Sequence, residues 1–360
     1  MAGVTKVADI NVSAREVDFV TQFGKNWTAL QEILGIMRPI QKKPGTTLVS
    51  YNTSLTLESG TVAEAATIPF SKASITPVSY DDITVEKFAK SVSVEAVAQY
   101  GADVAVIKTD EEFRNELQSN VMTRFYDFLK TGTLTDAKAT WQMAFAMSQG
   151  YVRDKFKKLR RDVTDIIQFV NILDVYEYLG AADISVQTQG GMTYLQNFMG
   201  ARSVILSSDI ERGKVIAVPA NNIDLYYIDP ADSDIARLGL QFTVSGETPL
   251  IGFHAEGKYS NMTGEAYAIM GMKLWAEYLD GISVVYVGTP TAVTSAETVT
   301  AESDGVTFNF AHNPVVSIQE VKDGSTAVTS GFKKTDNGIV FDSAPAGTVT
   351  VKYTYAAASV

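Results

Sequence analysis

The sequence predicts an α+β protein that carries an extended two-stranded arm, a long amphipathic helix and a small all-β domain. Three observations predict it: strands with alternating polarity over residues 46–94, an apolar stripe over residues 109–132, and short strands between closely spaced turns after residue 289. Between residues 166 and 288, strands and helices follow each other without regular βαβ alternation, which favours α+β over a parallel α/β sheet.

The composition limits the chemistry that is open to the chain. Its 360 residues carry a net charge of −11, and 46 % of them are hydrophobic, which is enough for a sizeable core. There is no cysteine, so disulfides and thiolate metal sites are excluded, and with only His254 and His312 a multi-histidine metal centre is excluded too. The acidic balance argues against a dedicated DNA-binding domain.

No targeting or membrane segment is predicted. The first 20 residues include charged side chains and lack an apolar core region, and no run of about 18 apolar residues occurs anywhere. We therefore expect a soluble protein that is made in the cytoplasm and has no membrane partner.

Residues 1–45 are mostly polar with isolated large apolar side chains, such as Phe19, Phe23 and Trp27. Two interpretations stand side by side: the segment covers a neighbouring subunit, or it is an ordinary helix packed on its own domain. Residues 46–94 predict a long hairpin that turns near Gly60 and carries polar side chains on both faces. Such an arm has few large apolar residues and cannot fold alone, so it must lie against something else.

Two helices are expected next. Over residues 109–132 an apolar residue recurs every four positions, Thr109 with Glu112 predicts a capping box, and Gly132 closes the helix. A second helix is predicted from Asp136 to Arg161. Its basic tail over residues 153–161 is either a solvated face favoured by the helix dipole or a non-specific contact to nucleic acid or an acidic partner.

Residues 165–171 predict a buried strand, 173–182 a short helix ended by Gly180, and 193–200 another helix. Two strands joined at Arg212–Gly213 follow, then a mixed strand and helix region over 263–279. From residue 289 the short Val-, Thr- and Phe-rich strands between turns predict a separate β-sandwich.

Few residues suggest chemistry, and we predict no catalytic, cofactor-binding or metal site. The Gly213–Lys214 pair lacks the rest of a phosphate-binding loop. Asp229, Asp232 and Asp234 are an acidic cluster without the glycine and distal glutamate of a calcium loop, which favours a self-capping turn. Isolated histidines are more often structural than catalytic; His254 would act as a base only beside a partner, and His312 is expected in a turn.

Several segments of the sequence resemble the major capsid proteins of tailed bacteriophages. Residues 68–94 (IPFSKASITPVSYDDITVEKFAKSVSV) and 110–132 (DEEFRNELQSNVMTRFYDFLKTG) are similar to the extended loop and spine helix of that family. Residues 169–182, 203–227 and 264–282 are similar to its axial domain and return strands. The tail resembles the Ig-like domains that are appended to phage virion proteins.

The resemblance implies the HK97-type capsid fold, with five segments in order. These are an N-terminal arm (1–45), the extended loop with the start of the peripheral domain (46–94), the peripheral domain with the spine helix (95–165), the axial domain with the return strands (166–288) and an Ig-like domain (289–360).

The resemblance also implies a structural role without cofactors. Copies would form hexamers and pentamers of an icosahedral virion shell, assembled in the bacterial host cytoplasm around double-stranded DNA. The implied partners are the chain itself, a separate scaffolding protein, a portal protein, weakly held DNA and, through residues 289–360, a host-surface glycan or protein. A covalent cross-link through Lys72 is not expected.

Three alternatives to the phage capsid remain: a tail-tube or baseplate protein, an encapsulin-like shell and an enzyme. The long helix disfavours a tube protein, since tube proteins are chiefly β, and the appended sandwich favours a virus over an encapsulin.

Overall fold

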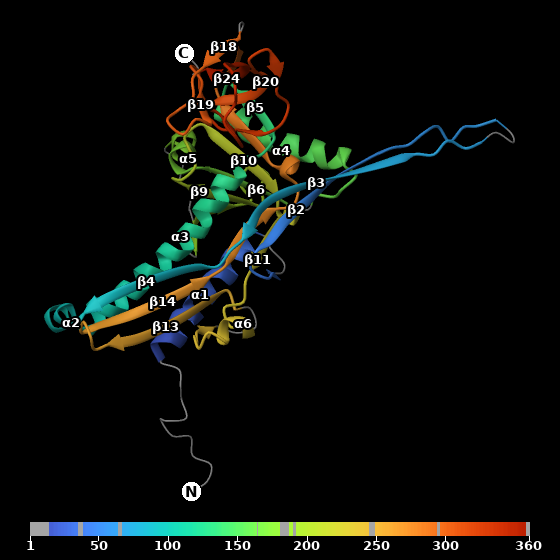
Figure 1. The fold of residues 1–360 in the computed structure, drawn as a ribbon. Coiled ribbons are helices and arrows are strands. Elements are labelled where there is room, and N and C mark those ends of the chain that lie inside the picture. Colours follow the sequence, from blue (N-terminus) through green and yellow to red (C-terminus); the bar gives the residue numbers. More distant parts are fainter. Residues whose placement is uncertain are drawn as a thin grey trace. The chain divides into compact units, whose positions relative to one another are not determined.

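The structure, a computed structural model, describes residues 14–34, 39–63, 67–163, 165–180, 187–189, 192–244, 249–293 and 296–357 (Figure 1). The chain divides into two compact units. Unit 1 comprises residues 1–24, 38–114 and 225–273, and unit 2 comprises residues 25–37, 115–224 and 274–360. Four elements cross from one unit into the other: α1 (Ala14–Leu34), α3 (Thr109–Leu129), β11 (Ile223–Tyr227) and β15 (Met272–Ala276).

Unit 1 is built on an antiparallel four-stranded sheet. The sheet has the order β12-β13-β14-β4, with β12 Thr243–Val244, β13 Ile251–Lys258, β14 Thr263–Met270 and β4 Glu86–Ser93. The other elements of this unit are β1 (Ile40–Gln41), β2 (Thr46–Thr56), β3 (Lys72–Ile83), α2 (Val94–Tyr100), the π-helix η2 (Asp103–Lys108) and α6 (Ser233–Ala236). β1 pairs with β11 in parallel.

The start of α1 packs on this sheet. Phe19 and Phe23 are buried, and the ring of Phe19 stacks on Phe253 of β13 at a centroid distance of 3.9 Å. Of the two interpretations of the N-terminal segment, its described residues follow the second, a helix packed on its own chain. Residues 1–13, which the predicted arm also includes, lie outside the described residues.

The predicted capping box at Thr109 is wrong. Thr109 has helical backbone angles, and its hydroxyl donates to the carbonyl oxygens of Ala105 and Val106, so the helical path already runs through η2 before α3. The hydroxyl also accepts a hydrogen bond from Lys90, and therefore it does not cap free amides. The predicted apolar stripe is confirmed: Leu117, Val121, Phe125 and Leu129 are buried.

Unit 2 is built on a mixed seven-stranded sheet with the order β5-β16-β10-β6-β9-β8-β7. The strands are β5 Leu134–Lys138, β16 Ser283–Val287, β10 Lys214–Pro219, β6 Ile166–Asn171, β9 Ser203–Ser207, β8 Met192–Gln196 and β7 Gln187–Gln189. Helices α4 (Trp141–Lys158) and α5 (Ile172–Leu179) and the 3-10 turns η3 (Ala220–Asn222) and η4 (Leu279–Gly281) complete this part. Its core includes Phe145 of α4, Val170 of β6 and Val215 of β10.

Three sequence-based expectations for these elements need correction. The helix predicted from Asp136 begins only at Trp141, because residues 134–138 pair with β16 as strand β5. Residues 193–200 are not a helix: β8 occupies 192–196, because this segment pairs with β9 and buries both Tyr194 and Leu195. In residues 263–279, β14 and β15 account for the regular structure up to residue 276, without an α-helix.

The C-terminal residues form two small sheets around one core. One sheet contains β17 (Thr289–Ala292), β24 (Val349–Ala357), β20 (Val315–Asp323) and β21 (Thr326–Ala327), with β18 (Glu297–Val299) on β24; the other contains β19 (Thr307–Asn309), β23 (Gly338–Phe341) and β22 (Phe332–Lys334). Phe308, Ile339 and Val351 pack in the core between them. This arrangement is all-β, as the turn spacing predicts, and its contacts group it with unit 2.

Candidate assembly surface

The residues that suggested chemistry lie apart in the fold. Asp229 and Asp232 each accept a hydrogen bond from a backbone amide two residues later, and Asp232 caps α6. These oxygens are therefore engaged in local turns, as the self-capping interpretation states. Within the described residues, no group of three or more potential ligands is arranged for a metal ion.

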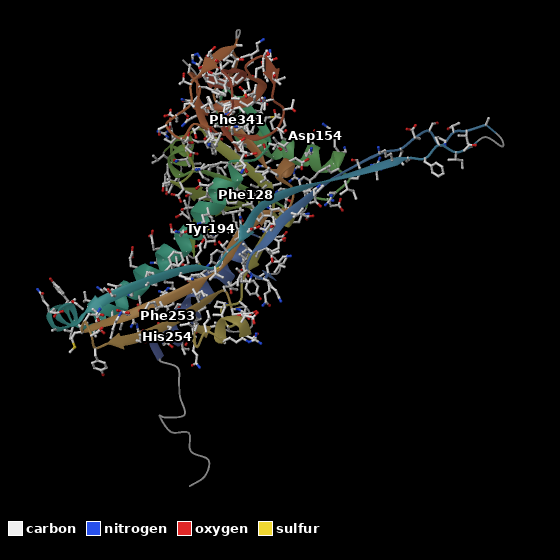
Figure 2. All side chains as sticks on the ribbon, viewed as in Figure 1. Phe128, Asp154, Tyr194, Phe253, His254 and Phe341 are labelled. Atoms are coloured by element: carbon white, nitrogen blue, oxygen red, sulfur yellow. The ribbon has the colours of Figure 1, made fainter. Side chains whose placement is uncertain are left out.

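The two histidines have different surroundings. The Nδ1 atom of His254 lies 3.4 Å from Oε1 of Glu16, a buried carboxylate that also accepts the Ala255 amide. Figure 2 labels His254 beside Phe253 on β13: Phe253 is buried against α1, and His254 is partly exposed. Glu16 is thus a carboxylate partner of His254, which the sequence alone could not show. The Glu16 carboxylate also joins α1 to β13. His312 stacks on Tyr355 in the C-terminal sheets.

The prominent surface feature of unit 1 is the arm formed by β2 and β3. Among the described residues these two strands pair only with each other, from Thr46↔Ile83 to Thr56↔Lys72, with a register shift between Thr47 and Val49. Figure 1 shows the two strands running side by side as a narrow ribbon. The hairpin predicted over residues 46–94 is therefore present, although residues 86–93 leave it as β4 and enter the four-stranded sheet.

The base of the arm is anchored within the chain. Leu48 and Ile83 are only 3 % and 1 % exposed. The Gly45 amide donates to the Ile83 carbonyl at 2.9 Å, and Thr47 donates to the Asp82 carboxylate. Burial of both strands at this end fixes where the arm begins.

The outer end of the arm has the opposite character. Phe70 is 93 % exposed, and four further apolar side chains around the turn are also exposed; the tip set is Leu57, Val62, Ile68, Phe70 and Ile75. Isolated exposed apolar residues are common, but here four lie in the loop between β2 and β3 and the fifth, Ile75, lies on β3. Lys72 stands at the start of β3 beside this set and is exposed.

The arm joins a unit whose helices and sheet are held by an ionic cluster. Asp110, which is nearly buried at the start of α3, accepts from Arg15 of α1 at 2.5 and 2.8 Å and pairs with Lys90 of β4 at 2.7 Å. Burial alone would raise the pKa of Asp110, but the hydrogen bonds from Arg15 and Lys90 outweigh it and hold this pKa below its ordinary value. Three elements are thereby tied to one carboxylate.

The basic tail of α4 is largely a paired or solvated surface. Lys155 pairs with Asp280 at 2.8 Å, Lys158 pairs with Asp154 one turn earlier, and Arg161 lies over the ring of Tyr278. These contacts fit the solvated-face interpretation, and the exposed Arg153, Lys157 and Arg160 leave a contact to an acidic partner open.

The described helices include none that is long and apolar enough to cross a bilayer.

Comparison with known proteins is informative only at the level of structure. No family model matches the sequence, and no curated protein matches it. Among solved structures, the chain is similar to the capsid asymmetric unit of cyanophage A-1(L), at 11 % identity and a TM-score of 0.43 over 79 % of this chain and 98 % of that chain. It is also similar to a chain of Mycobacterium phage Ogopogo, at 12 % identity and a TM-score of 0.43 over 72 % and 91 % of the two chains.

An encapsulin is among the similar structures as well. The holo-SrpI encapsulin complex of Synechococcus elongatus matches at 11 % identity and a TM-score of 0.39, over 79 % of this chain and 92 % of that chain. Phage capsid structures are thus among the solved structures to which this chain is similar.

Proposed function

We propose that this chain is a structural protein whose copies assemble into the capsid shell of a tailed bacteriophage. The observation that carries the proposal is the β2–β3 arm, with its base buried in its own chain and its apolar tip exposed. A two-stranded ribbon is at best marginally stable in water, and exposed apolar area is unfavourable. A neighbouring copy that covers the tip removes both costs, and in a closed shell every arm has such a neighbour.

The finer features follow from the resemblance in the sequence. Copies would be arranged as hexamers and pentamers around double-stranded DNA, with a scaffolding protein and a portal as partners, in a virion that is assembled in the host cytoplasm. The net charge of −11 suits a container that must not bind its DNA tightly. Residues 289–360 would form an Ig-like domain on the outer surface, as decoration or for adhesion to a host-surface glycan or protein. A structural rather than catalytic role is proposed throughout.

Expression of the full chain, alone and with a scaffolding protein, followed by negative-stain electron microscopy tests the proposal. Closed shells support it, whereas tubes or permanently dispersed subunits would contradict it. Shells that contain protein cargo instead of DNA would favour the encapsulin alternative.

A paired substitution tests the arm itself. Phe70→Ser should reduce the yield of shells without lowering the melting temperature of the subunit, because its side chain touches little in the isolated chain. Leu238→Ser is the matched control, since Leu238 is also an exposed apolar residue of unit 1 but lies far along the sequence from the arm. Equal assembly of both variants would rule out the arm tip as the contact.

A further inference from the structure

An ionic cluster around the buried Lys214 lies where the C-terminal sheets meet the seven-stranded sheet of unit 2. Lys214 on β10 and Tyr286 on β16 are direct cross-strand neighbours. Both reach the carboxylate of Asp336, in the turn between β22 and β23: Lys214 pairs with Oδ2, and the Tyr286 hydroxyl donates to Oδ1 at 2.9 Å. Two strands of the central sheet thus share one carboxylate of the C-terminal part.

A second lysine completes the cluster from the C-terminal side. The Nζ atom of Lys334, at the end of β22, donates to the Tyr286 hydroxyl at 3.1 Å and to the Val315 carbonyl at 2.9 Å. Glu211 accepts from Lys214 at 2.9 Å. We call Glu211, Lys214, Tyr286, Lys334 and Asp336 the Lys214 cluster.

The Lys214 cluster is balanced in charge, and Lys214 is shielded from water, whereas the Glu211 side chain is half exposed. Lys214 is 2 % exposed, and its ammonium pairs with both the Asp336 and the Glu211 carboxylates. Burial lowers the pKa of Lys334 to about 8 even though Asp336 opposes this shift. Burial of Glu211 acts against its ionisation, but Lys214 and Lys130 outweigh this effect and hold the pKa of Glu211 at about 2.

The backbone that joins β16 to β17 beside the cluster is short and closely packed. β16 ends at Val287 and β17 begins at Thr289, and the Gly288 amide between them donates to the Lys138 carbonyl at 2.8 Å. Gly288 has a φ of +152°, and a Cβ atom at this position would stand 2.7 Å from the Ala357 carbonyl oxygen. Residues 287–289 are therefore too short and too closely packed to act as a free linker.

We infer that the Lys214 cluster fixes residues 289–360 in one orientation on the central sheet, so that this domain is a rigid part of the subunit. The physical reason is that these ion pairs favour one orientation of the domain over others more than they add to its binding energy. Buried ion pairs roughly break even against their desolvation, whereas an arrangement that buries an ammonium without its carboxylate is strongly disfavoured. The orientation that places Asp336 between Lys214 and Tyr286 gives the Lys214 ammonium a second carboxylate beside Glu211 and so keeps that penalty lowest. This inference holds for the single subunit and does not depend on shell assembly.

The absence of cysteine from the chain makes a distance measurement straightforward. Spin labels at Gln142→Cys on α4 and Ser325→Cys in the turn after β20, both exposed, report the distance between the central sheet and the C-terminal sheets. The subunit is kept unassembled and diluted with unlabelled protein, so that distances between copies do not contribute. One narrow distance peak is expected for the parent chain, and a broad distribution there would overturn the inference.

Three variants separate the role of the charges. Asp336→Asn leaves Lys214 and Lys334 with Glu211 as the remaining carboxylate of the cluster, and the narrow peak should be lost. Adding Lys214→Met to Asp336→Asn removes the buried ammonium that has lost one of its two carboxylates, and should restore the peak. Lys130→Met is the matched control, because Lys130 also pairs with Glu211 but belongs to the segment after α3, outside residues 289–360; its peak should stay narrow. An unchanged peak in Asp336→Asn, or a double variant that remains broad or unfolded, would show that the cluster does not set the orientation.

Discussion

Phe19 on α1 stacks face to face on Phe253 of β13, with ring centroids 3.9 Å apart and planes inclined by 14°. The ring centroid of Phe113 lies 6.1 Å from that of Phe19, and the Arg114 guanidinium lies over the Phe19 ring. One side chain of α1 therefore contacts the four-stranded sheet and the start of α3 within unit 1.

Phe19→Ala is expected to destabilise the subunit by about 3–5 kcal/mol, because it removes a fully buried aromatic ring and leaves a cavity. Val17→Ala on the same helix is the control, since Val17 is half exposed and should change stability by less than about 1 kcal/mol. Urea unfolding of both variants measures the difference. Equal midpoints would mean that α1 does not pack on β13 in solution.

Leu117→Asp should give insoluble or unfolded protein. Leu117 is buried in the apolar stripe of α3, and an unpaired carboxylate there costs several kcal/mol. The neighbouring exposed residue Glu116 offers a control, Glu116→Asp, that retains the charge. A Leu117→Asp variant that melts like the parent would refute burial of the stripe.

The ion pairs of Asp110 with Arg15 and Lys90 predict that the folded chain loses stability in acid. The folded-state pKa of Asp110 lies below its ordinary value of 3.8, so its contribution is fully present above that value and is lost as the pH falls through the folded pKa. Compared with Asp110→Asn, the parent should be more stable at pH 6, and the difference should shrink below about pH 4. Thermal melts of both chains between pH 2 and pH 6 test this, and a difference that grows with acid would have the wrong sign.

Lys334 predicts a gain of stability in mild base. Its folded-state pKa is about 8 and its ordinary value is 10.5, so the unfolded chain binds more protons between these values and stability rises with pH there. Relative to Lys334→Met, the parent should gain on the order of 2 kcal/mol between pH 7.5 and 10, at about 1.4 kcal/mol per pKa unit. Chemical unfolding at several pH values measures the gain. A difference in unfolding free energy between the two chains that does not change with pH would mean that Lys334 is exposed to water.

Truncation after Gly288 tests the role of the C-terminal domain in assembly. We expect the shortened chain to form closed shells, as the change in composition at residue 289 predicts, but to melt at a lower temperature because Tyr286 and Lys214 lose their partners Asp336 and Lys334. Electron microscopy and a thermal melt separate the two outcomes. Truncated subunits that fold but never assemble would make the domain part of the shell contact.

Local patterns in the sequence predicted the elements whose signals are strong. The apolar stripe of α3 and the alternating strands β2 and β3 follow from side-chain periodicity, because spacing along one element decides which side chains share a face. An apolar run predicted the buried strand β6, and glycines predicted the Gly180 end of α5 and the turn at Arg212–Gly213. The apolar residues of the arm tip are visible in the sequence as well, although their exposure is not.

The tertiary structure decided what depends on distant partners. β8 is a strand because β9 offers it a partner, although residues 193–200 on their own favour a helix. Thr109 is helical because η2 precedes it, which a capping pattern cannot reveal. Lys214 and Asp336 are 122 positions apart, and each resembles an ordinary surface charge in the sequence. Only chain folding buries them together, since desolvation and pairing are properties of the packed state and not of either residue alone.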